Sequence, residues 1–260
     1  MITIRGNNLP RVKKQNKRSI KEVIYKYGPI SRSEIANMLS LTPPTITKNV
    51  ADLIREGLVQ ECETGDEQKN GKTLGRKPVN VDFISDAQYV VGIELGPYRT
   101  TMCIVDLRGN MLYDIKLPVA CKDYEKMIEN LARSIERLIA DSGLDRKKIL
   151  GIGVGLPGFV EGSRGVLRSS SRLEWNNKNI ATDLSARIKL PVRIENNTRV
   201  RAIGEELFSG KIRPDTFAYY FISNGIACSL IIKRNMFTGE TAGAGEVGHM
   251  VVKVNGPRCE

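Results

Sequence analysis

The sequence predicts two parts: a small, mostly helical N-terminal domain that ends in a β-hairpin, and a larger α/β domain behind it. In residues 18–57 the apolar side chains recur at helical spacing in three short segments. From residue 88 onward, near-continuous apolar strands alternate with amphipathic helices. We therefore expect a basic arm over residues 1–17, the small domain over residues 18–85 and the α/β domain over residues 86–260.

The composition is that of an ordinary globular chain. Of 260 residues, 41% are hydrophobic and 27% are charged, and no apolar run reaches the roughly 20 residues that a membrane span needs. The N-terminus has no apolar core of signal-peptide length, and the five cysteines are odd in number and scattered. We expect a cytoplasmic protein with free thiols and no membrane partner.

The net charge of +11 is partly gathered at the N-terminus. The first 18 residues hold six lysine and arginine side chains and no acidic one. An arm of this kind can follow the phosphate backbone of a nucleic acid. Basic tails also occur on proteins without such a partner, so the arm alone does not decide between the two.

Three helices are predicted in the small domain. The first covers residues 18–27 and ends at Gly28-Pro29. The second begins at the capping box Ser31–Glu34, and the third begins at Thr42-Pro43-Pro44 and ends at Gly57. A helix followed by two short helices with a tight turn is the layout of a helix-turn-helix DNA reader. A plain three-helix bundle explains the apolar spacing equally well.

A hairpin is predicted after the helices. Residues 58–63 and 79–83 have the pattern of strands, and the basic tip Gly75-Arg76-Lys77-Pro78 lies between them. Two strands around such a tip form a wing that reaches a minor groove or clamps phosphates. A solvated hairpin tip is the alternative, but with the helices in front we favour a winged helix-turn-helix that contacts DNA.

The side chains expected to contact DNA are small donors and acceptors, a proline and cations, most of them on what we expect to be the exposed face of the third helix. They are Arg32, Thr42, Pro44, Thr45, Thr47, Lys48, Asn49, Arg76 and Lys77.

The order of elements in the larger domain matches the opening of the actin-like ATPase and sugar-kinase fold, with a mixed sheet. Three strands precede a long amphipathic helix over residues 124–142, and a buried strand then runs into the glycine-rich turn that ends at Gly158. The glycines of that strand are spaced two apart and no helix starts directly afterwards, which excludes a dinucleotide-binding fingerprint.

Five motifs make the chain resemble the ROK family of repressors and sugar kinases over essentially its whole length. They are Ser31–Ala36, Gly75–Pro78, Gly151–Gly158, Glu195–Asn197 and Gly245–Met250. The resemblance is to the repressor branch, that of the xylose and N-acetylglucosamine repressors. It implies a winged helix-turn-helix joined to a sugar-kinase-like sensor domain.

Three parts of the kinase machinery of that family are altered here. Pro97 and Tyr98 stand in the first phosphate loop, where small residues and free amide donors are needed, and Ser223 begins an altered second loop. Asn197 stands where the kinases have their catalytic aspartate, and an amide cannot take a proton from a sugar hydroxyl, although it can hydrogen-bond one. The resemblance therefore implies a domain that binds a sugar, uses no ATP and is not an enzyme.

The resemblance also implies a sugar site at Asn196, Asn197, Glu246 and His249, since amides and carboxylates suit neighbouring hydroxyls. Arg172 lies where the family often has an asparagine near the sugar, and an arginine there favours an acidic or phosphorylated sugar.

In the family the histidine of this site also ligates zinc, together with three cysteines. Only His249 and Cys259 match that ligand set here, and a tetrahedral structural site needs four ligands. We therefore expect zinc from the resemblance but an incomplete set of ligands. Because the family's second lobe continues further, we also expect that lobe to be incomplete and to expose an apolar face.

These observations predict a sugar-responsive transcriptional repressor that binds double-stranded operator DNA as a homodimer or higher homo-oligomer. The first alternative is an ATP-dependent sugar kinase that carries a DNA-binding domain, which phosphate transfer to a sugar would establish. The second is a fragment that binds DNA without sensing a ligand.

Overall fold

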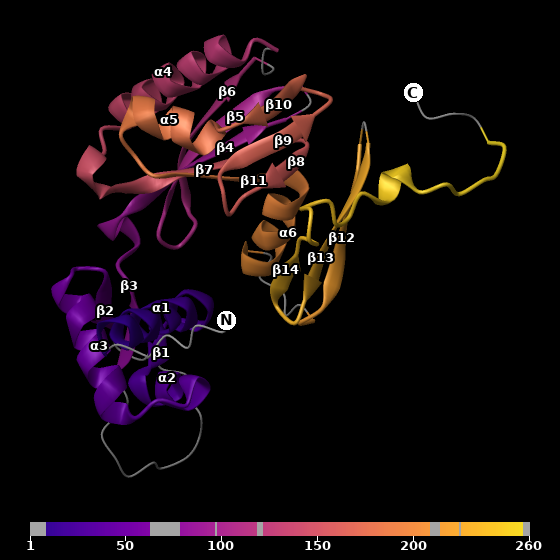
Figure 1. Ribbon diagram of the computed structural model, residues 1–260. Helices are drawn as coiled ribbons and strands as arrows, with labels where there is room; N and C mark the ends of the chain where they lie inside the picture. The colour runs from indigo at the N-terminus through magenta and orange to yellow at the C-terminus, as the bar shows by residue number, and fades with distance from the viewer. Residues whose placement is uncertain are drawn as a thin grey trace. The chain divides into compact units, whose positions relative to one another are not determined.

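The computed structural model describes residues 9–62, 79–96, 98–118, 122–208, 214–223 and 225–256. The chain divides into two compact units (Figure 1). The N-terminal unit comprises Met1–Gln88 together with Asp106–Asn110, and the C-terminal unit comprises Tyr89–Val105 and Met111–Glu260. The sequence places the boundary at residue 85 and gives no sign that residues 106–110 belong with the first unit.

The N-terminal unit is a winged helix-turn-helix, as predicted. Its helices are α1 (Leu9–Tyr27), α2 (Arg32–Leu39) and α3 (Pro43–Arg55), and its strands are β1 (Ile30–Ser31), β2 (Val59–Cys62) and β3 (Asn80–Phe83). The strands form an antiparallel sheet in the order β1–β3–β2. Apolar side chains from all three helices and the sheet meet in one core that includes Ile24, Ile35, Leu53 and Val81.

The first helix begins well before its predicted start at residue 18, so residues 9–17 are helical and are not an extended arm. Lys13 of α1 forms an ion pair with Asp52 of α3 at 2.6 Å, and Lys17 pairs with both Asp52 and Glu56. This part of α1 has no long apolar stripe. Because its stabilising partners lie in and just after α3, far away in the sequence, the local pattern does not predict that these residues are helical.

The capping box at the start of α2 is present as predicted. The backbone N–H of Glu34 donates to Ser31 Oγ at 3.2 Å, and the N–H of Ser31 donates to Glu34 Oε2 at 3.0 Å. The hydrogen bonds from Ser31 hold the pKa of Glu34 below its usual value.

Replacing Ser31 by alanine should destabilise the N-terminal unit by about 1 kcal/mol, because one helix donor loses its acceptor.

Glu34 has a lowered pKa in the folded state, so its stabilising contribution is present above the unfolded pKa and is lost as the pH falls through the folded pKa. Urea unfolding from about pH 6 to about pH 3 should therefore show a flatter acid limb for Glu34→Gln than for the wild type. Glu22→Gln, at an exposed position of α1, is the control, and a slope unchanged by Glu34→Gln would contradict the assignment.

The C-terminal unit is built on a five-stranded mixed sheet in the order β11–β7–β4–β5–β6. These strands are β4 (Tyr89–Leu95), β5 (Thr100–Asp106), β6 (Met111–Leu117), β7 (Ile149–Leu156) and β11 (Val192–Asn196). Strands β4, β7 and β11 are parallel, and β5 and β6 form an antiparallel hairpin. The sheet and its parallel core agree with the predicted sugar-kinase-like fold.

Helices cover the two faces of this sheet unequally. Helices α4 (Tyr124–Ser142) and α5 (Ile180–Ile188) pack over one face and close the main core, which includes Val91, Ile128 and Leu184. Helix α6 (Asn197–Phe208) lies against the other face, where Val200 approaches Gly155 of β7. Beside α6, a groove runs along part of this face.

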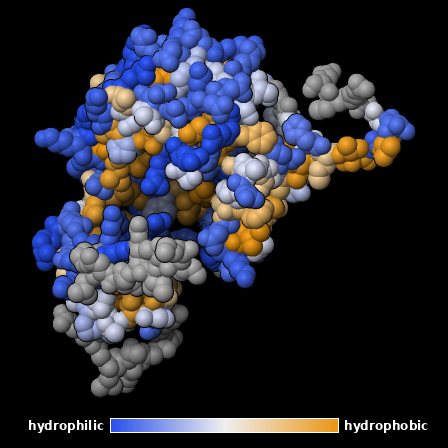
Figure 2. Space-filling model, viewed as in Figure 1, coloured by the Kyte–Doolittle hydropathy of each residue, from blue (hydrophilic) through white to orange (hydrophobic). Residues whose placement is uncertain are grey.

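Two smaller sheets complete the unit. One is formed by β8 (Phe159–Glu161), β9 (Val166–Ser170) and β10 (Trp175–Lys178), and the other by β12 (Phe217–Ile222), β13 (Ile226–Ile232) and β14 (Asn235–Phe237). The single-turn helices are η1 (Ser85–Ala87), η2 (Arg146–Lys148) and η3 (Val247–His249). The strands of the second small sheet expose Tyr220, Ile222, Ile226 and Phe237, as the predicted apolar face requires, and orange surface gathers there in Figure 2.

Across the described ranges, no helix combines the length and the apolar character that a membrane crossing requires.

Candidate DNA-contacting surface and candidate ligand site

Helix α3 presents one exposed face that contains small side chains and cations. Pro44, Thr47, Lys48 and Ala51 are all exposed and follow one another at helical spacing. Arg55, one turn further, is 77% exposed and contacts Asp52 at 3.0 Å. Lys48 has no ion-pair partner within the described ranges, so its charge is available to a phosphate or a base edge.

Asn49 does not belong to this face, and its predicted exposure is wrong. Its residue is 4% exposed, and its Nδ2 donates to the backbone oxygen of Thr45 at 2.8 Å. Asn49 lies on the inward side of α3 with Ile46 and Leu53, where the helical repeat directs it to the core. Ala51 and Arg55 take its place on the exposed face. The same helical repeat could have identified them, but alanine carries no polar group to attract notice.

The other predicted DNA-contacting residues have mixed surroundings. Thr42 and Thr45 share a hydrogen bond between their hydroxyls at 2.9 Å, at the first turn of α3. Arg32 donates to Glu61 of β2 at 2.6 Å, which fixes its guanidinium between α2 and the sheet. Arg76 and Lys77 lie outside the described residues.

Asn196 lies at the carboxyl end of β11, beside the carboxyl end of the parallel strand β7. In α/β sheets this is the edge at which ligands bind. Its Oδ1 accepts from the backbone N–H groups of Thr198 at 2.9 Å and Arg199 at 3.3 Å, which caps α6. Its Nδ2 donates to the oxygen of Gly158 at 3.0 Å. Asn196 thus holds the glycine-rich turn after β7 against the start of α6, with Asn197 directly beside it.

Arg199 joins this corner to the segment that carries the other predicted ligand residues. It is 4% exposed, its Nη1 donates to Glu195 Oε1 at 3.1 Å, and its Nη2 donates to the oxygen of Ala242 at 2.5 Å. Next along the chain, a Cβ atom on Gly243 would lie 3.3 Å from the ring of Phe159. Sequence reasoning missed Arg199, although a cation on the inward face of a helix is the kind of signal that marks a buried ion pair.

Glu246 and His249 lie at η3, next to β13. The N–H of Cys228 donates to the oxygen of Gly245 at 2.8 Å, and a Cβ on Gly245 would fall 1.8 Å from the oxygen of Cys228, so only glycine allows this approach. His249 is 75% exposed, and its Nε2 lies 4.0 Å from Glu246 Oε2. The structure thus connects the segment before Glu246 to Asn196 through Arg199 and leaves the imidazole open to solvent.

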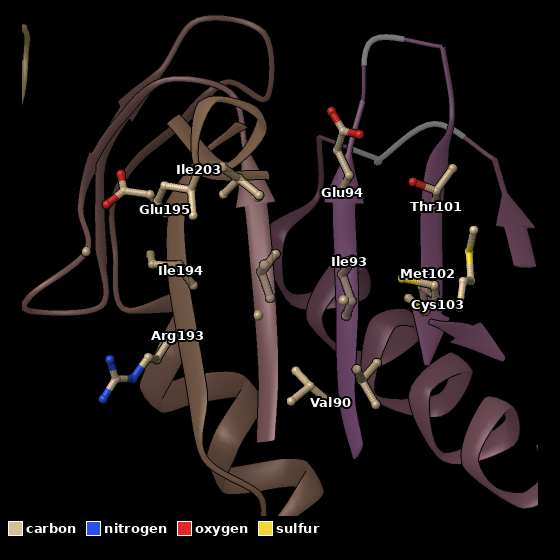
Figure 3. A pocket seen from close by; sticks show the side chains of 18 of the residues that line it. Val90, Ile93, Glu94, Thr101, Met102, Cys103, Arg193, Ile194, Glu195 and Ile203 are labelled. Atoms are coloured by element: carbon tan, nitrogen blue, oxygen red, sulfur yellow. The ribbon is translucent and has the colours of Figure 1, made fainter. Parts of the chain in front are cut away.

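A separate groove of about 810 Å³ lies on the α6 side of the central sheet. Gly92 and Gly153 lie among its lining residues, and Val200 and Ile203 of α6 form one wall. Figure 3 shows Ile203 beside the sheet and Glu94 at the end of its strand. None of the predicted sugar-binding residues lines this groove, although Glu195, which precedes Asn196 in the chain, does.

The end of β4, which the resemblance matches to the kinases' first phosphate loop, carries an ion pair. Arg201 of α6 donates to Glu94, and its guanidinium carbon lies 4.1 Å from the centroid of the Phe221 ring. In the segment expected to match the second loop, the N–H of Ser223 donates to the oxygen of Gly225 at 2.9 Å. Tyr98 is exposed, and Pro97 lies outside the described residues.

The described residues do not fit a closed zinc site. No three or more histidine, cysteine, aspartate or glutamate side chains among them lie close enough together to hold a metal ion, and His249 faces solvent. Cys259, the other predicted ligand, is outside the described residues. No role for zinc follows from these residues.

Comparison with known proteins agrees with both halves of this architecture. Residues 14–60 match a family model described as winged helix-turn-helix DNA-binding. The chain belongs to the ROK family, whose model matches residues 90–260.

Curated relatives and solved structures extend the likeness beyond single domains. The chain is 29% identical to the xylose repressor of Bacillus subtilis (strain 168) over 95% of its own length and 63% of the relative. It is 25% identical to the DNA-binding transcriptional dual regulator NagC of Escherichia coli (strain K12), over 97% of this chain and 61% of that protein. It thus spans about three fifths of these relatives.

The crystal structure of a ROK family transcriptional regulator, described as a homolog of the E. coli MLC protein, superimposes with a TM-score of 0.79 at 25% identity, covering 95% of this chain and 62% of that one. A ROK family glucokinase from Streptomyces griseus shares the fold, with a TM-score of 0.57 at 22% identity, over 64% of this chain and 51% of that one.

Proposed function

We propose that the chain is the DNA-binding and sugar-sensing part of a cytoplasmic transcriptional repressor whose operator affinity is set by a sugar. The observation that carries the proposal is the exposed face of α3, with Thr47, Lys48 and Ala51, on a winged helix unit that continues into a ROK unit. A recognition helix with this surface suits the major groove of double-stranded DNA. Two copies on paired half-sites would give the usual operator geometry.

The names of the relatives support a sugar or a sugar derivative as the ligand. They are repressors called after xylose and N-acetylglucosamine. In this chain Asn196 uses its amide to hold the corner together, and Asn197 beside it supplies a second amide. Glu246 and His249 on the connected segment add a carboxylate and an imidazole for hydroxyl groups.

The surroundings of Glu94 favour sensing over phosphate transfer. Its carboxylate is paired with Arg201, and the exposed Tyr98 adds bulk in a stretch where a phosphate loop would need small residues and free amide donors. Asn197 offers an amide where proton abstraction would need a carboxylate.

The test measures binding of the chain to fragments of its own promoter by fluorescence anisotropy, with and without D-xylose, N-acetylglucosamine and their phosphate esters. We expect tight binding without sugar and a change of about 5–150-fold with one of them. L-xylose is the control, because it has the same composition but the wrong stereochemistry. Transfer of phosphate from ATP to any of these sugars would contradict the proposal. So would a chain that binds none of the promoter fragments.

A further inference from the structure

The turn at Asp106–Asn110 belongs to the N-terminal unit, although it connects β5 and β6 of the other unit's sheet. Asp106 shapes it: its Oδ1 accepts from the N–H groups of Arg108 at 2.8 Å and Asn110 at 2.9 Å, and its Oδ2 accepts from Asn110 Nδ2 at 2.9 Å. The buried carboxylate therefore fixes the turn and presents the Arg108 side chain outward from it.

Arg108 joins this turn to two elements of the winged helix. Its Nη1 donates to the oxygen of Tyr25 at 3.1 Å and to that of Ile24 at 3.4 Å, at the carboxyl end of α1. Its Nη2 donates to Asp82 of β3. The last carbonyls of a helix lack partners within the helix, and a cation there is favoured by the helix dipole. One guanidinium thus ties the end of α1 to the strand that follows the wing.

The neighbouring residue strengthens the attachment. The N–H of Leu107 donates to the oxygen of Ser85 at 3.0 Å, and the Leu107 side chain packs against the core of the N-terminal unit. The turn is therefore held by apolar contact as well as by charge.

Gly28 shows how closely the parts fit. A Cβ atom there would lie 2.6 Å from the oxygen of Ile24, 2.7 Å from Asp82 Oδ1 and 2.9 Å from Arg108 Nη2. No side chain fits at this position without displacing the anchor. The phenol of Tyr25 senses the same charges. Burial raises the pKa of Tyr25, Arg108 opposes this rise, and Asp106 adds to it.

We propose that Arg108 is the positioning residue through which ligand binding in the ROK unit changes the DNA affinity of the winged helix unit, an inference that rests on the proposed function. The turn continues at both ends into β5 and β6, so a shift of these strands pulls on the end of α1 and on β3. Coupling requires an element whose position both sites influence, and this turn belongs to the N-terminal unit while its two ends continue into strands of the other unit.

The chemistry of arginine is essential to this role. Its planar fork donates in two directions at once, to the helix carbonyls and to the carboxylate. A lysine keeps the charge but has a single ammonium and cannot reproduce the fork. Arg108→Lys is therefore a sharper probe than truncation, because it leaves the unit charged and is less disruptive to folding.

The experiment uses the full 260-residue chain as wild type, Arg108→Lys and Asp82→Asn. Arg137→Lys is the matched control, because that arginine is exposed and pairs with Asp141 one turn away on the same helix. Affinity for the promoter fragment is measured without sugar, with D-xylose and with N-acetylglucosamine. We expect the two anchor variants to keep sugar-free affinity within about twofold and to lose most of the sugar-dependent change. A full sugar response in Arg108→Lys would overturn the coupling role.

Hydrogen exchange separates this inference from the proposed function. In Arg108→Lys, amides at the end of α1 and in β3 should exchange faster than in the wild type, and those of α4 should not change. Unchanged exchange at both places would overturn the anchor itself. A wild type that binds DNA but responds to neither sugar would contradict the sensing function and with it the coupling. The hydrogen-exchange comparison would still show whether Arg108 anchors the turn.

Discussion

Replacing Ala51 by glutamate is expected to lower the affinity for operator DNA about a hundredfold. The side chain lies on the exposed face of α3 between Lys48 and Arg55, so a carboxylate there would meet phosphates and base edges with like charge or unpaired acceptors. Like charges brought together across an interface cost several kcal/mol of binding free energy. A loss of about 2–3 kcal/mol lowers the affinity about a hundredfold. The measurement is anisotropy on a promoter fragment at fixed salt, since these affinities depend strongly on ionic strength.

Ala140→Glu makes the same chemical change at an exposed position of α4 and serves as the control. Glutamate is a good helix former, so neither variant should lose more than about 0.5 kcal/mol of stability. Equal DNA affinity in Ala51→Glu and Ala140→Glu would remove α3 from the DNA-contacting surface.

Replacing Arg199 by methionine is expected to destabilise the C-terminal unit by about 3 kcal/mol, because a buried ion pair loses one partner. Glu195 would keep a poorly solvated carboxylate, and the oxygen of Ala242 would lose its donor. We place the cost at the low end of the range for buried pairs because the Glu195 side chain retains some solvent contact. Urea unfolding followed by circular dichroism measures it.

The same variant should also lose the sugar response, since Arg199 links the Asn196 corner to the segment before Glu246. Arg137→Met, which removes an exposed pair on α4, should cost no more than about 0.5 kcal/mol and leave the response intact. A stable Arg199→Met protein with a normal sugar response would show that the link is dispensable.

The winged helix could be predicted because its signals are local. The capping box at Ser31 and the apolar stripes of α2 and α3 lie within a few residues of each other, and the structure reproduces both. The first half of α1 could not be predicted in this way, because Lys13 and Lys17 find their partners on α3. The small sheet β8–β10 was also missed, since its strands are short and partly polar.

The candidate sites show the same division between local and distant information. The exposure of Thr47 and Lys48 could be predicted from the helical repeat, whereas Asn49 was misplaced because a polar side chain was assumed to face outward. Arg199 was missed although Glu195, its ion-pair partner, lies one helical turn away, and only its contact with Ala242 is distant. Arg108 was missed because it reaches residues more than 80 positions away. A sequence such as Leu107-Arg108-Gly109-Asn110 has the composition of an ordinary solvated turn.

The anchored turn also bears on how such proteins can be recombined. A chimaera that exchanges residues 1–88 for those of another regulator would bring in a foreign helix end and a foreign β3 but keep Leu107 and Arg108 of the recipient. The exchanged module would then meet a leucine and a cation to which its own core and helix end are not matched. Swapping DNA specificity in this scaffold therefore calls for a discontinuous graft, in which Asp106–Asn110 travels with the N-terminal unit although it is encoded within the other one.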